Sequence, residues 1–139
     1  MTESYWDGEN WLDVYEEENI LQYFLNDELH RKDGPAVIFY YDNGFIESKE
    51  YCLNGKFHRK DRPSLIHYKD DGTIFEEYYY NNGELHREDG PAELYYKNND
   101  ITFKYYFYNG IEFDPNMLPF EMPIDSPEKE FMFKLKYGE

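Results

Sequence analysis

Apolar or small residues alternate with more variable ones along three stretches of the chain, each of which directly follows a proline. The alternating positions are Ala36, Ile38 and Tyr40 after Pro35, Ser64, Ile66 and Tyr68 after Pro63, and Ala92, Leu94 and Tyr96 after Pro91. A period of two is typical of a β-strand with one buried face. We therefore predict a strand in each stretch, with these positions facing inward and the intervening positions facing outward.

Each predicted strand ends at a cluster of residues that favour chain reversal. The clusters at 42–44, 70–72 and 98–100 consist of Asp, Asn and Gly, which accept positive φ or hydrogen-bond their own backbone. A second strand is predicted after each cluster, near 45–53, 73–81 and 101–108. Further turns are predicted at Asn54-Gly55, Asn82-Gly83 and Asn109-Gly110, while the corresponding pair at 26–27 is Asn-Asp.

These strands and turns belong to three copies of one sequence unit. The copies begin at Tyr23, Tyr51 and Tyr79 and align without gaps, so each spans 28 residues. A fourth copy begins at Phe107 but decays, as a terminal capping unit of a repeat protein does. Several positions recur in all three copies: His30, His58 and His86, then Arg31, Arg59 and Arg87, then Asp33, Asp61 and Asp89, then Pro35, Pro63 and Pro91.

The fold class predicted from this repeat is all-β. Tandem β-hairpins would lie side by side in one elongated, twisted antiparallel sheet that forms a single domain. Residues 1–22 would be an acidic capping segment, 23–113 the three repeats with a partial fourth, and 114–139 a Pro-rich segment. The run FMFKLKY at 131–137 is predicted to form a strand that covers the open edge of the sheet.

The repeat resembles the variant MORN-type repeats (membrane occupation and recognition nexus) of bacterial, bacteriophage and giant-virus proteins. Their motif Asn-Gly-x-Leu-His-Arg-x-Asp-Gly-Pro-Ala matches residues 82–92 best, residues 29–36 well and residues 57–64 more loosely. The resemblance covers about 23–113 and implies an interaction scaffold rather than one activity. In copy two Arg62 replaces the Gly. We expect this to disturb the turn, because a non-Gly residue at positive φ costs about 1 kcal/mol.

The formal net charge is −16, and the acidic residues concentrate at the amino-terminal end. Residues 1–28 contain nine Asp and Glu and no Lys or Arg. Such a surface repels nucleic acid phosphates and anionic membranes, and it attracts basic proteins. We predict a basic protein partner, no direct nucleic acid binding and no membrane association, and the oligomeric state stays open. The alternative is that the acidic residues only keep a Tyr-rich β protein in solution.

The single cysteine, Cys52, cannot form an intramolecular disulfide, and the first residues lack the pattern of a secretory signal. We therefore expect a cytoplasmic protein, in the host cytoplasm if it is viral. Cys52 itself is predicted to pack as a small apolar side chain within a strand.

Neither a metal site nor an active site is predicted from the repeated polar residues. Equivalent histidines in adjacent copies would lie roughly 10 Å apart, too far for shared metal ligation. We predict that the His-Arg pairs are structural, with the imidazole bonded to a turn carbonyl and Arg31 paired with Asp33. No nucleophile or carboxylate pair stands out, so no enzyme activity and no cofactor are expected.

Three hypotheses for function remain. The first is a phage or viral inhibitor of a basic host-defence or nucleic-acid-processing protein. The second is sequestration of an anionic nucleotide by Arg31, Arg59 and Arg87, with Tyr rings for stacking. The third is an antitoxin or immunity protein. For the first hypothesis, the predicted partner-binding residues combine acidic groups of the amino-terminal segment with outward residues of copy one: Asp13, Glu16, Glu17, Glu18, Val37, Phe39 and Tyr41.

Overall fold

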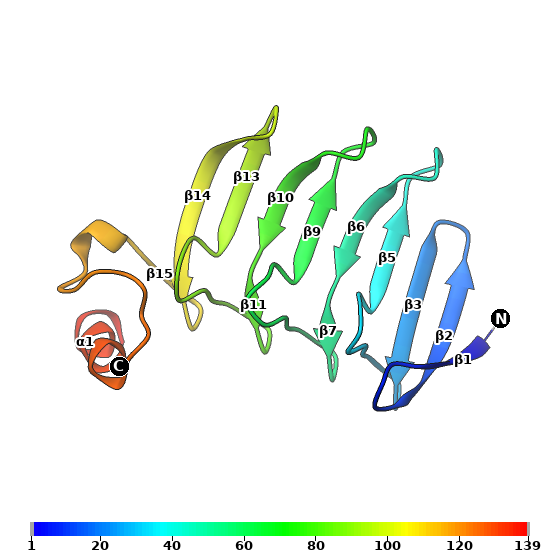
Figure 1. Ribbon diagram of the computed structural model, residues 1–139, viewed down its shortest axis with the longest axis horizontal. Coiled ribbons are helices and arrows are strands. Elements are labelled where there is room, and N and C mark those ends of the chain that lie inside the picture. The colour runs from blue at the N-terminus through cyan, green and yellow to red at the C-terminus, as the bar shows by residue number, and fades with distance from the viewer. Residues whose placement is uncertain (1, 139) are drawn as a thin grey trace.

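The computed structural model describes residues 2–138 and shows one long, open, antiparallel β-sheet (Figure 1). The all-β hairpin prediction is confirmed. The strands follow the order β1-β2-β3-β5-β6-β9-β10-β13-β14-β15, with β4 paired to β3. The long strands are β1 (Thr2–Trp6), β2 (Trp11–Glu17), β3 (Ile20–Leu25), β5 (Val37–Tyr40), β6 (Ile46–Glu50), β9 (Leu65–Tyr68), β10 (Ile74–Tyr78), β13 (Glu93–Lys97) and β14 (Asp100–Tyr108).

Each repeat adds one large hairpin and one small hairpin. The large hairpins are β5-β6, β9-β10 and β13-β14, and their turns all lie at the same end of the strands, at the top of Figure 1. The predicted second strand is interrupted in copies one and two, at Tyr51 and Tyr79. The small pairs that follow lie at the opposite end of the strands: β7 (Cys52–Leu53) with β8 (Lys56–Phe57), β11 (Tyr80–Asn81) with β12 (Glu84–Leu85), and β14 with β15 (Ile111–Phe113).

The Asn-Gly turns adopt the conformation that their sequence favours. Asn54 and Gly55 both have positive φ, at 50° and 79°, as the tight turns of two-residue hairpins require. The turn at Asn26-Asp27 has the same conformation without a glycine, with φ of 51° and 66°, and it joins β3 to β4 (Glu28–Leu29). The small hairpins are linked in series, because Gly55 donates its N–H to the Leu29 carbonyl and Gly83 donates to that of Phe57.

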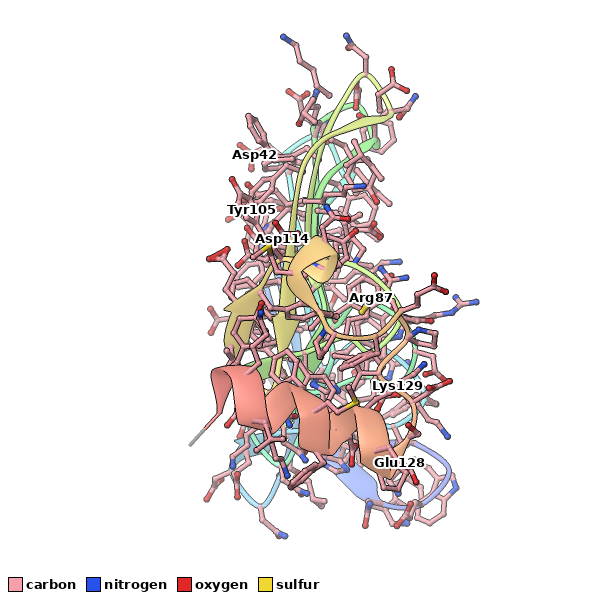
Figure 2. All side chains as sticks on the ribbon, turned by 90° about the vertical axis from the view of Figure 1, so that its left-hand side faces the viewer. Asp42, Arg87, Tyr105, Asp114, Glu128 and Lys129 are labelled. Carbon is pink, nitrogen blue, oxygen red and sulfur yellow. The ribbon has the colours of Figure 1, made fainter. Side chains whose placement is uncertain are left out.

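The sheet is a single layer, so its two faces differ in what they present. Seen edge-on in Figure 2, Tyr105 and Arg87 lie on opposite sides of the sheet. On one side, which we call the Arg-Tyr face, each repeat arginine lies over a tyrosine ring. The guanidinium carbon is 4.2 Å from the ring centroid for Arg31 over Tyr23, 3.7 Å for Arg59 over Tyr51 and 4.1 Å for Arg87 over Tyr79.

Buried apolar residues gather at the two ends of the sheet. Leu12, Val14 and Tyr23 form one cluster at the amino-terminal end, where the hairpin β2-β3 includes the end of the predicted capping segment. The second cluster comprises Tyr108, Phe113, Ile124 and Phe133. The repeats between them bury further apolar residues, among them Ala36, Ile66, Ala92 and Leu94. The two end clusters correspond to the capping units that a repeat array needs at its ends.

The carboxyl-terminal run predicted as a strand is instead part of a helix, α1 (Pro127–Tyr137). Ser126 caps it by accepting the N–H of Lys129, and Pro127 occupies the first turn. These local signals outweigh the alternation in 131–137. The helix still covers the end of the sheet, because Phe133 is 1% exposed and packs 4.9 Å from the ring of Tyr108. A short 3₁₀ helix, η1 (Pro115–Met117), precedes it.

Neither helix of the described chain has the length and apolar character needed to cross a lipid bilayer.

Candidate functional site

The face opposite the Arg-Tyr face is built from two rows of side chains that run across eight strands. Residues directly opposite one another in paired strands point to the same side of a sheet, so the pairing register defines the rows. The first row is Glu17, Ile20, Phe39, Ser48, His67, Glu76, Tyr95 and Phe103. The second row is Tyr15, Gln22, Val37, Glu50, Leu65, Tyr78, Glu93 and Tyr105. We call these sixteen residues the carboxylate-aromatic face.

The charges in the two rows have one sign. Four glutamates are present together with His67, and none of the sixteen residues is Lys or Arg. The corresponding row on the Arg-Tyr face is different: it reads Glu16, Leu21, Ile38, Lys49, Ile66, Glu77, Leu94 and Lys104. There acids and bases balance, so within these rows the excess of negative charge lies on the carboxylate-aromatic face.

Tyrosine hydroxyl groups hold two of these glutamates in place. Tyr78 donates to Glu76 at 2.9 Å and Tyr95 donates to Glu93 at 3.2 Å. The Tyr78 and Tyr95 rings meet edge to face with centroids 6.1 Å apart. Burial raises the pKa of Tyr78, and its hydrogen bonds to Tyr95 and Glu76 raise it further, so the hydroxyl stays protonated and remains a donor. The hydroxyl groups thereby hold the two carboxylates in defined positions.

Glu50 is a half-buried carboxylate with no counter-charge. It lies between Val37 and Leu65 in the neighbouring strands, and burial raises its pKa. Among residues 2–138 no cationic group forms an ion pair with it. A partly desolvated, unpaired carboxylate is unfavourable in the free protein, and a cation that docks beside it would relieve that cost.

Exposed aromatic rings and carboxylates surround a hollow at the carboxyl-terminal end of this face. The hollow has a volume of about 380 Å³, and Glu93, Glu112, Phe103 and Tyr105 are among the residues that line it. Phe103 is 62% exposed and Tyr105 is 40% exposed. An aromatic ring beside a carboxylate can receive a lysine or arginine side chain through both a cation–π contact and an ion pair.

A smaller hollow of about 200 Å³ lies near the amino-terminal end of the same face. It is lined by Tyr15, Gln22, Phe24 and Asp27, and the rings of Tyr15 and Phe24 meet edge to face at 5.3 Å. Aromatic groups with a nearby carboxylate therefore lie near both ends of the rows.

Only some of the predicted partner-binding residues lie on this face. Asp13 and Glu17 point to it from β2, and Phe39 is in the first row. Val37 is in the second row but is only 2% exposed, so its prediction as part of an exposed patch is wrong. Its short side chain lies in an internal strand between the longer Gln22 and Glu50.

The remaining predicted residues lie elsewhere. Glu16 points to the opposite face, where it is paired with Leu21, and Glu18 is in the exposed turn between β2 and β3. Tyr41 follows β5 and donates its hydroxyl to the Tyr68 carbonyl at 2.7 Å. Sequence reasoning missed Glu50, Glu76 and Glu93. Glu93 lies in the first strand of copy three, at an intervening position already predicted to face outward, but Glu50 and Glu76 lie in second strands, whose faces can be assigned only from the pairing register.

Of the nine amino-terminal carboxylates, two are used to attach the segment to copy one. Asp7 accepts the Lys32 N–H at 3.0 Å, and Glu9 forms an ion pair with the Lys32 ammonium group. Burial acts to raise the pKa of Asp7, but its three backbone hydrogen bonds lower it overall. The surplus negative charge of this segment therefore resides in its other acidic side chains.

The repeat histidines serve the fold by tying each copy to the next. His30, His58 and His86 accept, at Nδ1, the backbone N–H of Asn54, Asn82 and Asn109 at 2.9 to 3.1 Å. The structural role agrees with the prediction, but the imidazole accepts from a turn N–H instead of donating to a turn carbonyl. Each acceptor must be the neutral form of the ring. Burial accordingly lowers the pKa of His86.

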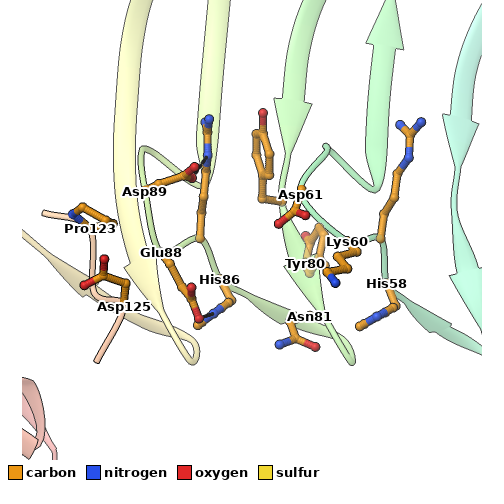
Figure 3. A pocket seen from close by; sticks show the side chains of 13 residues that line it. His58, Lys60, Asp61, Tyr80, Asn81, His86, Glu88, Asp89, Pro123 and Asp125 are labelled. Atoms are coloured by element: carbon orange, nitrogen blue, oxygen red, sulfur yellow. Dashed lines mark hydrogen bonds and ion pairs between the residues drawn. The ribbon is translucent and has the colours of Figure 1, made fainter. Parts of the chain in front are cut away.

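A hollow of about 510 Å³ separates the histidine loops of copies two and three (Figure 3). Side chains of both signs line it, among them Lys60, Asp61, Glu88 and Asp125. The carboxyl-terminal segment borders it, because Ile124 donates its N–H to the Glu88 carbonyl at 2.9 Å. Its mixed charge gives it no preference for cations or anions. Within residues 2–138, His, Cys, Asp and Glu side chains form no group of three suited to metal binding.

The single cysteine is buried and unpaired, as predicted. Cys52 is 3% exposed, and burial raises the pKa of its thiol to about 12. It is therefore a packed side chain and not a nucleophile at neutral pH.

Comparisons of the chain with protein-family models, with curated proteins and with solved structures gave no match. The resemblance to MORN-type repeats stays a prediction.

Proposed function

We propose that this protein is a non-enzymatic interaction module that binds a basic protein through the carboxylate-aromatic face. The observation that carries the proposal is the composition of the two rows, in which four glutamates and several aromatic rings occur without one Lys or Arg. Charges of one sign on a surface favour encounter with the opposite sign and disfavour other partners.

The shape of the face suits an extended segment of the partner. Eight strands about 4.8 Å apart give rows roughly 34 Å long. An extended chain of about ten residues covers that length. Lysine or arginine side chains of such a segment would reach Glu50 and the hollow bordered by Phe103 and Tyr105. The exposed rings supply apolar contact area, and the glutamates fix the position of the bound segment along the rows.

The finer proposal is that the partner is a host-defence or nucleic-acid-processing protein and that binding inhibits it. Its support is the net charge of −16, which resembles that of a nucleic acid in sign, and the repeat resemblance to phage and viral proteins. A protein that handles nucleic acid has a basic surface to which a carboxylate array is complementary.

Two triple variants of equal charge test the face. Glu50, Glu76 and Glu93 are replaced by Gln in the first variant. Glu3, Glu16 and Glu128, which lie on the other face or on α1, are replaced in the second. Binding of a fluorescent ten-residue oligolysine is measured at 0.15 M salt, and then binding of the partner captured from the native host. We expect the first variant to bind about tenfold more weakly and the second to change by less than twofold. Equal losses in both variants would show that net charge alone attracts the ligand, and the proposed face would be wrong.

A further inference from the structure

The three repeat arginines have the same sequence position but not the same partners. Arg31 donates from Nε to Asp33 at 2.8 Å, and Arg87 donates from Nε to Asp89 at 3.0 Å. Arg59 keeps two features of its counterparts: it lies over a tyrosine ring and donates from Nη1 to the carbonyl of the following proline, at 3.1 Å. Among the described residues, however, no carboxylate lies within 4.0 Å of its guanidinium.

The cause is a single substitution within the repeat. In copy one, a Cβ atom on Gly34 would lie 2.9 Å from Cζ of Arg31, and in copy three one on Gly90 would lie 2.8 Å from Cζ of Arg87. The repeat glycine therefore leaves room for the guanidinium, which would have to shift if a Cβ atom were present. It does not serve positive φ, since neither glycine has it, and our sequence-based reason for expecting a disturbed turn is wrong.

In copy two the residue at this position is Arg62, whose Cβ leaves no room for the same arrangement. The backbone of the preceding Asp61 has a φ of 62°, whereas Asp33 and Asp89 have no positive φ. Asp61 lines the hollow between copies two and three and lies on that side of its loop in Figure 3. Asp61 therefore differs from its two counterparts in backbone conformation and does not pair with Arg59.

Arg59 and Lys60, which also line the mixed-charge hollow between copies two and three, border a second hollow that is mostly basic. This hollow, of about 580 Å³, lies between the loops of copies one and two, and its lining includes Arg31, Lys32, Arg59, Lys60 and a single acid, Asp33. Asp33 is already bonded to Arg31 and to the Tyr5 hydroxyl, at 2.6 Å. Lys60 is exposed and forms no ion pair within the described chain.

The strongly negative net charge does not prevent an anion from binding here. Exposed charges separated by more than about 8 Å are largely screened at physiological salt, so the groups nearest the hollow decide its preference. Lys32 is partly neutralised by Glu9, but Arg59 and Lys60 are not. The ring of Tyr51 holds the Arg59 guanidinium in place at 3.7 Å, so little side-chain freedom is lost when a ligand binds.

We propose that Arg59, assisted by Lys60, binds the phosphate or carboxylate group of a small anionic ligand in this hollow. The oxyanion takes the position that the aspartate Oδ1 has beside Arg31 and Arg87. It accepts from Nε–H and from the adjacent Nη2–H, the two-donor edge with which arginine recognises planar or tetrahedral oxyanions. Of the three repeat arginines, only Arg59 takes an external ligand, because the other two already have an internal one.

The decisive experiment compares Arg62→Gly with Arg62→Gln. Both variants remove the same charge, but only glycine restores the sequence Lys-Asp-Gly-Pro of copy one and lets Asp61 return to Arg59. Inorganic phosphate, AMP, acetate and uncharged adenosine are titrated at constant ionic strength. The chemical shifts of the Arg59 side-chain Nε–H and of the amides of residues 59–62 are followed by NMR.

We expect saturable shifts in the wild type and in Arg62→Gln, with affinities that agree within twofold. Arg62→Gly should bind about tenfold more weakly, because Asp61 then competes for the same edge. Saturation by phosphate and AMP but not acetate assigns the site to phosphate, and the reverse assigns it to carboxylate. Shifts that do not saturate, or equal affinities for Arg62→Gly and Arg62→Gln, would overturn the proposal. The Gln variant of Glu50, Glu76 and Glu93 should bind the anion as the wild type does, which keeps this result separate from the proposed protein-binding face.

Discussion

The two faces of the sheet are made from the same strands, yet they handle charge in opposite ways. On the Arg-Tyr face each arginine lies on a tyrosine ring, and two of the three are paired with an aspartate two residues away. On the carboxylate-aromatic face two of the four glutamates, Glu76 and Glu93, accept from tyrosine hydroxyls, and no Lys or Arg lies within the two rows. Apart from Arg59, the repeat arginines of the first face are paired within the chain. The second face carries the carboxylates to which we propose that a basic partner binds.

This comparison predicts the largest difference in stability for aromatic residues on the two faces. Replacing Tyr79 by Ala removes a ring that Arg87 covers, and we expect the free energy of unfolding to fall by about 3 kcal/mol. Phe103 is 62% exposed on the other face, so Phe103→Ala should cost less than about 0.5 kcal/mol. Urea unfolding of both variants measures the contrast. Similar losses would mean that the carboxylate-aromatic face is part of the structural core.

A smaller loss is expected when a link between copies is removed. His58→Ala leaves the Asn82 N–H without its acceptor at 3.1 Å, and we expect unfolding to become easier by about 1 to 2 kcal/mol. His67 lies on the carboxylate-aromatic face, where its nearest carboxylate, Glu76, is 3.9 Å away, and His67→Ala should cost less. Binding of the partner by folded His58→Ala should be unchanged. Unchanged stability together with lost binding would show that His58 binds a ligand and does not stabilise the fold.

Removing the charge of Glu50 should increase the stability of the free protein. The folded pKa of Glu50 is raised by burial, so ionisation is disfavoured in the folded state. The resulting penalty is present at neutral pH and disappears as the pH falls through the folded pKa. Glu50→Gln should therefore stabilise the free protein at pH 7, by less than the loss at His58, while it weakens binding of the basic partner. The exposed Glu47→Gln in the same strand is the control, and equal effects of the two would remove Glu50 from the binding face.

The smallest expected effect is a dependence of the free energy of unfolding on pH that arises from His86. Burial lowers the folded pKa of His86, against the opposing influence of Glu88, Glu84 and Glu130. Above the unfolded pKa of about 6.5 neither state binds a proton, so this residue gives no slope there. Below it the unfolded chain binds the proton first, and the free energy of unfolding decreases as the pH falls. Unfolding measured at pH 7.5, 6.5 and 5.5 should show less decrease in His86→Gln, and an unchanged slope would assign the effect to other groups.

The repeat itself was readable because its signals are local. Asn-Gly turns require positive φ at two neighbouring residues, and the alternation after each proline reports which side of the strand is apolar. The structural role of His30, His58 and His86 followed from their period. Their true partners did not, because the N–H groups that donate to them lie 23 or 24 residues further along the chain.

The candidate sites could not be predicted from local sequence, because they depend on which residues of distant strands pair with one another. Register shifts interrupt the pairing of β5-β6, β9-β10 and β13-β14, so alternation counted across a turn does not give the face of the returning strand. Val37 was assigned to an exposed patch for a related reason: its side of the strand was right, but its burial depends on neighbours in β3 and β6.

The sequence by itself determined the all-β class, the 28-residue period, the turns and the ends of the array, because backbone conformation and strand period are set by residues close together in the chain. Only the tertiary structure decided that four glutamates meet on a face without cations and that Asp61 does not pair with Arg59. Both depend on long-range register and on the space that one Cβ atom occupies. The capping strand became a helix for a different reason: Ser126 and Pro127 begin a helix locally, and the apolar ends of β14 and β15 then bury Phe133.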